Sequence, residues 1–570
     1  MSVKIKNSST GNKLTTFLVF IVLTSFALLP ACKQTAVIPA DPHQMVVSTH
    51  PAASKVGFDI LKEGGNAFDA AIAVQFALAV VYPRAGNIGG GGFAVFHEAN
   101  GRNGALDFRE VAPISAFPKL YYEEENRVNY QASLIGSYAV GVPGTVDGMW
   151  KMHVKKGKLD WRQLIQPAIN LAEKGVILTE QEAAHMNEYS RIIDSVSISP
   201  TVFGTKHWKA GDLFIQTDLA NTLKLIRDNG REGFYDGPTA DKLIRTIKIR
   251  HGIMRKNDLQ RYTSVWRDAL KGYYKDYTII TMPPPSAGGV MLLQMLFGAD
   301  FLNIDKKGFN STDYLHYLIE IQRRTYADRA EFFGDPDFNF VPVDKLLSPL
   351  FLEKKYKDIG PLATPSSAIN PSTKVSIESF ETTHFSVVDR WGNAVAITTT
   401  LNGNYGSKLV ADGAGFLLNN EMNDFTIEIG KANQFGMVGG KMNEIVGGKR
   451  MLSNMTPTII MKDKDLYAVL GTPGGSTIPT VVMQAAMNIM AFNMSMQAAV
   501  SAPKIHSQWM PDEVYYDQSL SPAVVDSLKK LGHIMKYTPL GKLNCIKRLP
   551  DGTLQGGTDT LKSDGSIMGD

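Results

Sequence analysis

The sequence predicts a layered α+β fold, in which helices and strands occupy separate blocks. Helical periodicity covers Ala53–Pro83 and most of Gly157–Ala330, whereas β-prone runs dominate for a stretch after Thr382. Glycine-rich segments join the blocks, and no repeat of about 20 to 50 residues is evident. A regular βαβ protein would instead alternate strands with helices along the whole chain.

The composition is that of a folded globular protein: of 570 residues, 44% are apolar and 20% are charged. The net charge of +4 is too weak to indicate nucleic acid as a partner, and there is no long basic run. The 11 histidines are scattered, and neither a CxxC nor an HExxH motif occurs. We expect no metal site and no cofactor.

The N-terminal residues have the pattern of an export signal. A lysine-containing leader precedes Leu14–Leu29, a mainly apolar run of 16 residues that is shorter than the roughly 20 needed to span a membrane. The run ends in "LPAC", which is similar to the lipobox of bacterial lipoproteins. We therefore interpret residues 1–31 as a signal peptide and Cys32 as the lipidated first residue of the mature protein. The alternatives are an uncleaved anchor or an ordinary signal with a chance cysteine.

The fold is expected to begin after a tether. Residues 32–44 contain two prolines and no clear periodicity, which is typical of a linker. Two helical patterns follow, and the first ends at Gly64–Gly65, as helices often do. The second, Ala67–Val81, is apolar nearly all round, which predicts a buried helix.

The stretch "ETTHFSVVDRWGNAVAITTTLN" predicts a β-hairpin. His384–Val388 and Ala394–Thr400 are β-prone runs, and "DRWGN" between them supplies turn residues. Threonines gather at both tips, with Thr382 and Thr383 at the start and Thr398–Thr400 at the end. The local pattern gives no reason for these hydroxyls.

Two glycine-rich loops raise the question of a nucleotide site. "GNIGGGGF" follows a helix and precedes a strand-like run, the reverse of the dinucleotide-binding order, and it lacks the Gly-Lys-Ser/Thr of a P-loop. We interpret it as a turn in which backbones approach closely. "GTPGGS", Gly471–Ser476, lies between a strand and a helix, so its N–H groups could converge on an anion, although the local pattern alone favours a plain turn.

Nine motifs together resemble the γ-glutamyltransferase (γ-glutamyl transpeptidase) family, in the family's order from about Met45 to the C-terminus. The resemblance implies an N-terminal-nucleophile hydrolase fold, a four-layer αββα sandwich, made as one chain that cuts itself. The cut would fall between Glu381 and Thr382. It would give a large subunit, 45–381, and a small catalytic subunit, 382–570, that form a heterodimer. The motifs are "NAFDAAIAVQFALAVVYPRAGNIGGGGF", "LDFREVAP", "GVPGTVDGMW", "PPPSAGGV", "YADRAEFFGDPDF", "TTHFSVVDRWGNAVAITTTLN", "LLNNEMNDF", "MLSNMTPT" and "GTPGGSTI".

The implied chemistry needs a threonine at a new chain terminus. A threonine hydroxyl is a poor nucleophile without a base, and a free α-amine titrates near 8, so Thr382 would carry both groups. Its Oγ would attack first the preceding carbonyl and later a γ-glutamyl amide, and water or an amino group would take the acyl group. By the same resemblance Thr400 steadies the nucleophile, and the N–H groups of Gly474 and Gly475 receive the oxyanion.

The glutamyl end of the donor is a zwitterion, so its pocket needs both signs of charge. Arg109 in "DFRE" matches the family's arginine for the α-carboxylate, which a guanidinium can bind in a bidentate manner, and Ser453 adds a hydroxyl. Asn402, Glu421 and Asp424 match the acceptors of the α-ammonium. Each alone could be a surface charge or a turn residue, and only their joint occurrence in order favours a pocket.

Two positions depart from the family pattern. Asn454 stands where many relatives have a second serine, and because an amide can donate and accept, we expect contact with the carboxylate in a changed geometry. Thr426–Arg450 has the length of the lid loop of lid-bearing relatives, with Phe435 where these often have a tyrosine. We expect a lid that lacks the tyrosine's hydrogen bond, and therefore more hydrolysis.

The resulting prediction is an exported enzyme, lipid-anchored in the bacterial cell envelope as a periplasmic or outer-membrane-attached protein, with no other membrane contact. Its donors would be glutathione and related small γ-glutamyl compounds, and its acceptors water, amino acids or peptides. Two alternatives remain open: an amidohydrolase acting on poly-γ-glutamate or a β-lactam side chain, and a binding lipoprotein that has lost activity. The intact Arg109 and lid-length segment favour small donors, and the intact Thr382 and Thr400 favour an enzyme.

Overall fold

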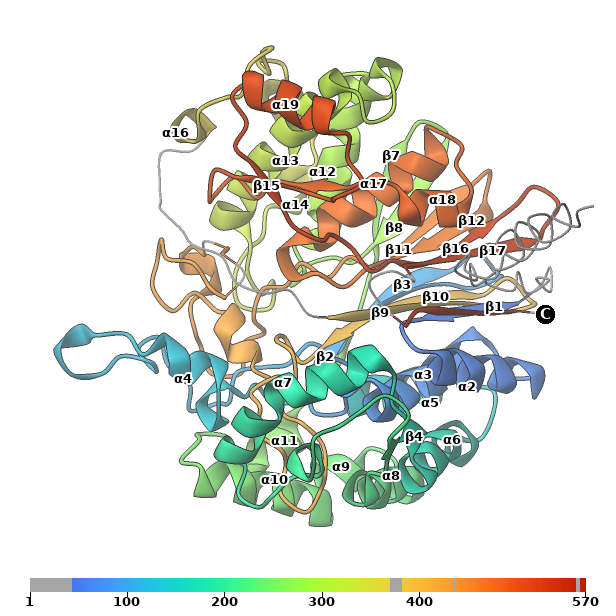
Figure 1. Ribbon diagram of the computed structural model, residues 1–570, viewed down its shortest axis with the longest axis vertical. Helices are drawn as coiled ribbons and strands as arrows, with labels where there is room; N and C mark the ends of the chain where they lie inside the picture. Colours follow the sequence, from blue (N-terminus) through green and yellow to red (C-terminus); the bar gives the residue numbers. More distant parts are fainter. Residues whose placement is uncertain (1–43, 370–381, 435, 438, 560–563, 570) are drawn as a thin grey trace, which may run out of the picture. The chain divides into compact units, whose positions relative to one another are not determined.

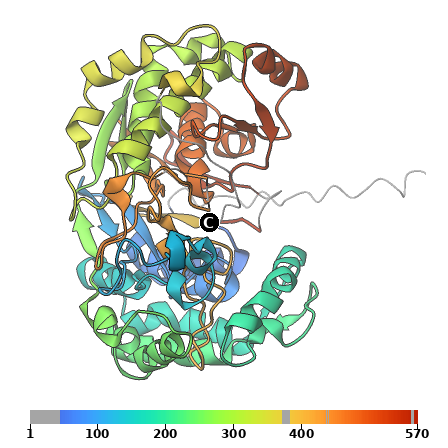
Figure 2. The same ribbon diagram turned by 90° about the vertical axis from the view of Figure 1, so that its left-hand side faces the viewer.

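Two antiparallel sheets lie between two layers of helices, in the order αββα (Figures 1 and 2). The computed structural model describes residues 44–569 apart from 370–381, 435, 438 and 560–563, all within one folded unit, Ala40–Asp570. Among the described residues, no helix is both long and apolar enough to cross a membrane. The layered α+β architecture predicted from the sequence is confirmed.

The larger sheet has seven strands, and residues distant in the sequence lie side by side in it. The predicted hairpin forms the centre of this sheet, flanked by the first and second strands of the chain. The strand order is β18 (Ser566–Gly569), β1 (Met45–Ser48), β9 (Thr383–Val388), β10 (Ala394–Thr400), β2 (Gly91–His97), β3 (Asn103–Asp107) and β6 (Val265–Arg267).

The second sheet has six strands, two of which the sequence analysis did not predict. Gly157–Ala330 is mainly helical, as predicted, but β6, β7 and β8 also lie within it. The run "YTIIT" of β8 is rich in β-branched residues, but it is short and lies among long helical patterns. The order is β17 (Leu554–Thr558), β16 (Asn544–Arg548), β12 (Asp465–Leu470), β11 (Thr458–Lys462), β8 (Tyr277–Thr281) and β7 (Leu270–Tyr274).

One helical layer covers the seven-stranded sheet, and it is built around α3 (Ala67–Val81). Every residue of α3 is buried, as its all-round apolar pattern predicts, and Asn66 caps its N-terminus. One apolar core joins α3 to the outer face of the sheet, including Phe385 and Val395. The other helices of this layer are α2 (Pro51–Lys62), α5 (Thr145–Lys156), α6 (Trp161–Lys174), α8 (Thr217–Asn229) and α10 (Gly237–Ile249).

A second apolar core fills the space between the two sheets and extends to the other helical layer. It combines inward side chains of the large sheet, such as Val95 and Ala396, with those of the small one, such as Ile459 and Val469. The helices of this layer are α12 (Gly288–Phe301), α13 (Thr312–Phe332), α15 (Pro349–Tyr356), α17 (Ile478–Met490), α18 (Met496–Ser501) and α19 (Pro522–Lys530).

Further elements complete the fold. The α-helices and strands outside these sheets and helix groups are α4 (Tyr130–Leu134), β4 (Val176–Ile177), α7 (Glu180–Val196), β5 (Leu213–Phe214), α9 (Glu232–Tyr235), α11 (Lys256–Arg261), α14 (Val343–Leu346), α16 (Ser366–Ile369), β13 (Ile505–His506), β14 (Val514–Tyr516) and β15 (Met535–Tyr537).

Candidate active site

The central hairpin places Thr400 beside Thr382. Thr399 of β10 lies opposite Thr383 of β9, so Thr400 ends its strand next to the residue that precedes the partner strand. Both side chains are enclosed, with 4% of Thr382 and 3% of Thr400 exposed. The predicted hairpin is confirmed, with β9 one residue longer than expected.

The other threonines at the tips of the hairpin form hydrogen bonds with polar groups inside the sandwich. Thr383 shares a hydrogen bond with Thr49 at 2.7 Å, and Thr399 donates to the carbonyl of Gly91 at 2.9 Å. Thr398 Oγ1 lies 2.9 Å from Nδ1 of His384, whose pKa burial lowers to about 3, so this imidazole is neutral. Threonine supplies both a β-branched side chain and a hydroxyl at these positions, which explains the cluster.

The "GNIGGGGF" stretch contains the close-packed turn that the sequence predicts, and from Gly91 onward it forms the start of β2. A Cβ on Gly90 would lie 2.1 Å from the carbonyl oxygen of Thr400, and one on Gly91 would lie 2.6 Å from Oε2 of Glu110. Only glycine fits at such distances. The loop therefore holds the end of β10 against the residues around Glu110.

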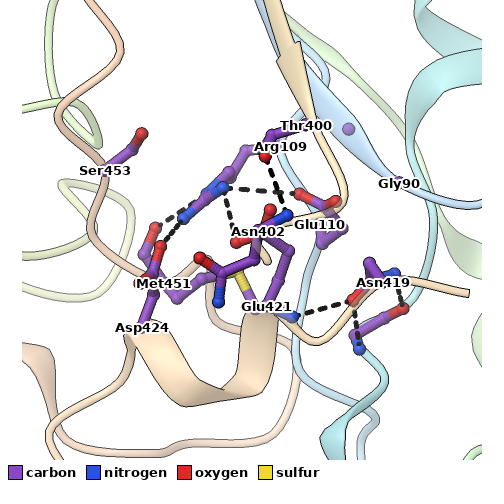
Figure 3. A network of polar contacts seen from close by, with 12 residues as sticks. Gly90, Arg109, Glu110, Thr400, Asn402, Asn419, Glu421, Asp424, Met451 and Ser453 are labelled. Atoms are coloured by element: carbon purple, nitrogen blue, oxygen red, sulfur yellow. Dashed lines mark hydrogen bonds and ion pairs between the residues drawn. The ribbon is translucent and has the colours of Figure 1, made fainter. Parts of the chain in front are cut away.

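A buried charge cluster lies beside this turn, centred on Arg109 (Figure 3). Its Nη1 lies 2.8 Å from Oε2 of Glu421, and its Nη2 lies 2.5 Å from Oδ2 of Asp424. The backbone carbonyls of Met451 and Leu452 each accept a hydrogen bond from the guanidinium at 3.3 Å. Three of the predicted pocket residues thus meet in one place.

Glu110 is a third carboxylate of the cluster, and the sequence interpretation did not assign it a role. Its Oε2 lies 3.7 Å from Nη1 of Arg109, and both of its oxygens are buried without a hydrogen-bond partner among the described residues. Its position next to Arg109 in "DFRE" was the only signal in the sequence.

The charged groups of this cluster shift the pKa values of one another. Burial alone disfavours the charged guanidinium, but Glu421, Asp424 and Glu110 outweigh it and raise the pKa of Arg109 above its ordinary value. Burial also raises the pKa of each carboxyl, and the single positive charge of Arg109 offsets only part of this effect. The cluster therefore favours cations and retains protons more readily than exposed carboxylates do.

Asparagines tie the cluster to the hairpin. The backbone N–H of Asn402 donates to Oγ1 of Thr400 at 2.7 Å, and its Nδ2 donates to the carbonyl of Asn420 at 2.9 Å. Asn419, whose role the sequence did not indicate, donates to the carbonyls of Gly89 and Gly141 and accepts from the N–H of Glu421. These bonds fix the carboxylates relative to Thr400.

Ser453 and Asn454 follow the carbonyls that hold Arg109. The Ser453 hydroxyl accepts from the N–H of Met455 at 3.1 Å, and Figure 3 places this serine to one side of the Arg109 cluster. Asn454 Oδ1 accepts from Nε of Arg329 at 2.6 Å. Both side chains are 4% exposed.

The "GTPGGS" loop also packs on the hairpin. It links β12 to α17, as predicted, and a Cβ on Gly471 would lie 2.2 Å from Cε1 of His384. Gly474 and Gly475 have φ values of 134° and 52°, a region that favours glycine. Their backbone N–H groups therefore lie in a loop that contacts the strand beginning after Thr382.

Three predicted residues, Cys32, Glu381 and Phe435, lie outside the described residues. The neighbours of Phe435 contact the charge cluster: Asn433 Nδ2 lies 3.2 Å from Oδ1 of Asp424, and the N–H of Gln434 lies 3.1 Å from Oδ1 of Asn423. In the described part of the chain, no three His, Cys, Asp or Glu side chains are placed to hold a metal ion.

Comparison with known proteins fits this geometry. The family model for gamma-glutamyltranspeptidase matches residues 53–569. The chain belongs to the gamma-glutamyltranspeptidase family. Relatives in this family include the glutathione hydrolase proenzyme of Pseudomonas aeruginosa, which is 43% identical over 490 residues and is matched over 85% of this chain and 86% of its own length.

Other relatives mark the breadth of the gamma-glutamyltranspeptidase family. The acylase ACY 1 proenzyme of Pseudomonas sp. (strain SE83) is 33% identical over 90% of this chain and 91% of its own. Cephalosporin acylase from Bacillus halodurans superposes with a TM-score of 0.80 at 25% identity, covering 95% of this chain and 98% of that one. The Helicobacter pylori gamma-glutamyltranspeptidase superposes with a TM-score of 0.55 at 44% identity, covering 56% of this chain and 93% of that one. The fold is thus the N-terminal-nucleophile hydrolase sandwich that the resemblance implies.

Proposed function

We propose that this protein is a self-processing γ-glutamyltransferase that cleaves the γ-glutamyl amide bond of glutathione and related compounds. It passes the acyl group to water, amino acids or peptides. The observation that supports this best is the enclosed cluster of Arg109, Glu421 and Asp424 beside Thr400, in a chain of the gamma-glutamyltranspeptidase family.

The charges of the cluster suit a zwitterion. In the uncut chain the Arg109 guanidinium is paired with Glu421 and Asp424. A donor with both an α-carboxylate and an α-ammonium can exchange this internal pairing for two new ion pairs, because it brings one charge of each sign. A donor with a carboxylate alone leaves Glu421 and Asp424 with less counter-charge, and that costs binding energy in a buried site. Ser453 and Asn402 would add a donor and an acceptor to the two ends of the zwitterion.

Self-cleavage before Thr382 would create the catalyst. Thr382 Oγ attacks the carbonyl carbon of Glu381, the peptide nitrogen leaves as the new α-amine, and water hydrolyses the resulting ester. The products are the large subunit, up to Glu381, and the small subunit, from Thr382, which remain paired because their strands share one sheet.

Turnover would repeat this chemistry on the donor. The free α-amine accepts the proton of Thr382 Oγ, and Oγ then bonds to the γ-carbonyl carbon of the donor. The amine half of the donor takes up a proton and leaves. The N–H groups of Gly474 and Gly475 stabilise the oxyanion, and Thr400 holds the nucleophile. Water or an amino acceptor then releases the γ-glutamyl group.

The chain around Phe435 would act as a lid on the bound donor. Support comes from Asn433 and Gln434, which contact Asp424 and Asn423. Because a phenyl ring cannot replace the hydrogen bond of a lid tyrosine, Phe435→Tyr should raise the ratio of transfer to hydrolysis. An unchanged ratio would remove this part of the proposal.

We also propose export and lipid anchoring in the bacterial cell envelope, through cleavage of residues 1–31 and acylation of Cys32. The support is the sequence of the leader and the "LPAC" motif. Cys32→Ser should release the protein from the membrane fraction, and retention of this variant would argue for an uncleaved anchor.

The first test is self-cleavage. Residues 33–570 are expressed and analysed on a denaturing gel with mass measurement. We expect two chains, with Thr382 as the new N-terminus of the smaller. Thr382→Ala should give one uncut, inactive chain. A single chain from the unaltered sequence would contradict the proposal and favour a binding lipoprotein.

The second test separates a γ-glutamyltransferase from a related acylase. γ-Glutamyl-p-nitroanilide and glutaryl-p-nitroanilide differ only in the α-ammonium, so they form a matched pair. We expect the γ-glutamyl compound to be preferred by about 100-fold or more in kcat/KM, because the glutaryl compound leaves Glu421 and Asp424 unpaired. Equal rates would favour an acylase, and release of glutamate from poly-γ-glutamate would favour a polymer-cleaving enzyme.

A further inference from the structure

A second buried arginine lies beside the charge cluster, and its contacts differ from those of Arg109. Arg329, on α13, is 5% exposed and donates from Nε to Oδ1 of Asn454 at 2.6 Å. No carboxylate in the described part of the chain forms an ion pair with it. Its principal partner is therefore a neutral amide.

The chemistry of the two groups fixes which way the amide faces. A guanidinium has five N–H donors and no acceptor, whereas an asparagine amide has one end that accepts and one that donates. Only Oδ1 can face Arg329, so Nδ2 must point the other way. In the uncut chain Nδ2 faces the thioether sulfur of Met437, which is a weak acceptor. A buried amide in this position can bind a stronger acceptor.

The position of Asn454 indicates which acceptor this is. The segment that carries Asn454 also carries the carbonyls of Met451 and Leu452, which accept from Arg109. Asp424 connects the two arginines, since both charges act on its carboxyl. Asn454 thus lies in the same pocket wall as the group expected to bind the donor's α-carboxylate.

We propose that Arg329 is a positioning residue, which holds Asn454 with its NH2 group toward the α-carboxylate of the γ-glutamyl donor. This inference rests on the proposed function. Without Arg329 the amide is free to turn and can present its oxygen to the carboxylate, which repels it. Burial lowers the pKa of Arg329 to about 10, so the side chain remains a protonated donor at neutral pH.

A double-mutant cycle tests the orientation. A serine hydroxyl rotates and has no fixed donor end, so Asn454→Ser removes the feature that Arg329 controls. For γ-glutamyl-p-nitroanilide we expect Arg329→Met to raise KM about tenfold, with kcat changed less than about twofold, because one amide–carboxylate hydrogen bond is lost and the reacting atoms are untouched. In the Asn454→Ser background the same change should raise KM less than about threefold.

Two further variants make the test specific. Arg329→Lys keeps donor-only chemistry, so its KM should stay within about threefold of the unaltered protein. Arg324→Met removes the same kind of side chain from the same helix, at a position bonded to Glu320 and Thr364, and should not change KM. Each protein is first checked for two chains on a denaturing gel.

The outcomes separate this inference from the proposed function. If Arg329→Met raises KM by the same factor in the unaltered protein and in the Asn454→Ser variant, or if it lowers kcat alone, Arg329 has a structural role and the proposal is overturned. If Arg329→Met does not mature, Arg329→Lys and Asn454→Ser decide, and a tenfold rise in KM for Arg329→Lys contradicts the orientation model. Failure of the proposed function would instead appear as no release of nitroaniline by the unaltered protein.

Discussion

Arg109 and Arg329 are both buried in one pocket, yet their surroundings give them different chemistry. Arg109 faces three carboxyl groups, which raise the pKa of its guanidinium despite burial. Arg329 faces an amide, and burial lowers its pKa. The first arginine is thus held by charge and the second by the geometry of its donors. Residue type alone does not tell these roles apart, because the partners decide them.

The contrast extends to what each arginine leaves behind when it is removed. Loss of Arg109 removes the guanidinium that pairs with Glu110, Glu421 and Asp424, so these three carboxylates face one another without it. Loss of Arg329 leaves an asparagine oxygen without its donor. An uncompensated buried charge costs more than an unpaired neutral group.

The largest expected effect is on stability. In a Thr382→Ala chain, which stays uncut under our proposal, we expect Arg109→Met to lower the free energy of unfolding by ~3–5 kcal/mol, the usual cost of breaking a buried ion pair. Arg329→Met should cost ~1–3 kcal/mol, the desolvation penalty of one unsatisfied polar group. Thermal unfolding midpoints of the two variants provide the measurement. If Arg329→Met were the more destabilising, the distinction between charge and geometry would be wrong.

A smaller effect is expected when the charge of Arg109 is kept and its shape is changed. Arg109→Lys retains one positive charge, but a single ammonium cannot reach Glu421, Asp424 and the two backbone carbonyls together. We expect the KM for γ-glutamyl-p-nitroanilide to rise about 10- to 100-fold, equivalent to one or two charge-assisted hydrogen bonds. Arg329→Lys, expected to be nearly neutral, is the matched control. An unchanged KM in the Arg109→Lys variant would show that charge alone suffices at this position.

Part of this architecture follows from local sequence. The buried helix Ala67–Val81 and the central hairpin have periodicities and turn residues that decide their structure, and both are confirmed. The hairpin of β7 and β8 was missed because its short runs lie among long helical patterns. Strand order could not be predicted at all, since it depends on pairings such as β1 with β9 between residues far apart in the chain.

The site shows the same division. The residues of the nucleophile and pocket were named by resemblance to a family, and the structure brings Arg109, Glu421 and Asp424 together. Glu110 and Arg329 were not assigned, because no periodicity indicates which charged residues are buried beside the pocket. The contact of Arg329 with Asn454 joins positions 125 residues apart, so only the folded chain reveals it.

The smallest effect concerns Glu110, and it tests whether the Arg109 side of the pocket is short of positive charge. Burial raises the pKa of Glu110 from its ordinary value of 4.5 to about 8. Below about pH 4.5 the carboxyl is protonated in both folded and unfolded chains, so its ionisation does not change the free energy of unfolding with pH. As the pH rises from 4.5 to 8, the unfolded chain releases this proton first, which lowers the free energy of unfolding. Glutamine stays neutral throughout, so Glu110→Gln should raise the unfolding midpoint at pH 8 more than at pH 5.

The control for this pH series is Glu353→Gln, which replaces a solvent-exposed carboxylate and should give no such trend. All variants are compared in the Thr382→Ala chain, so that self-cleavage does not alter the unfolding midpoint. A gain from Glu110→Gln that is constant with pH, or that shrinks toward pH 8, would mean that Arg109 neutralises Glu110 completely. The two arginines would then differ in their partners, but neither would lie among carboxylates that lack counter-charge.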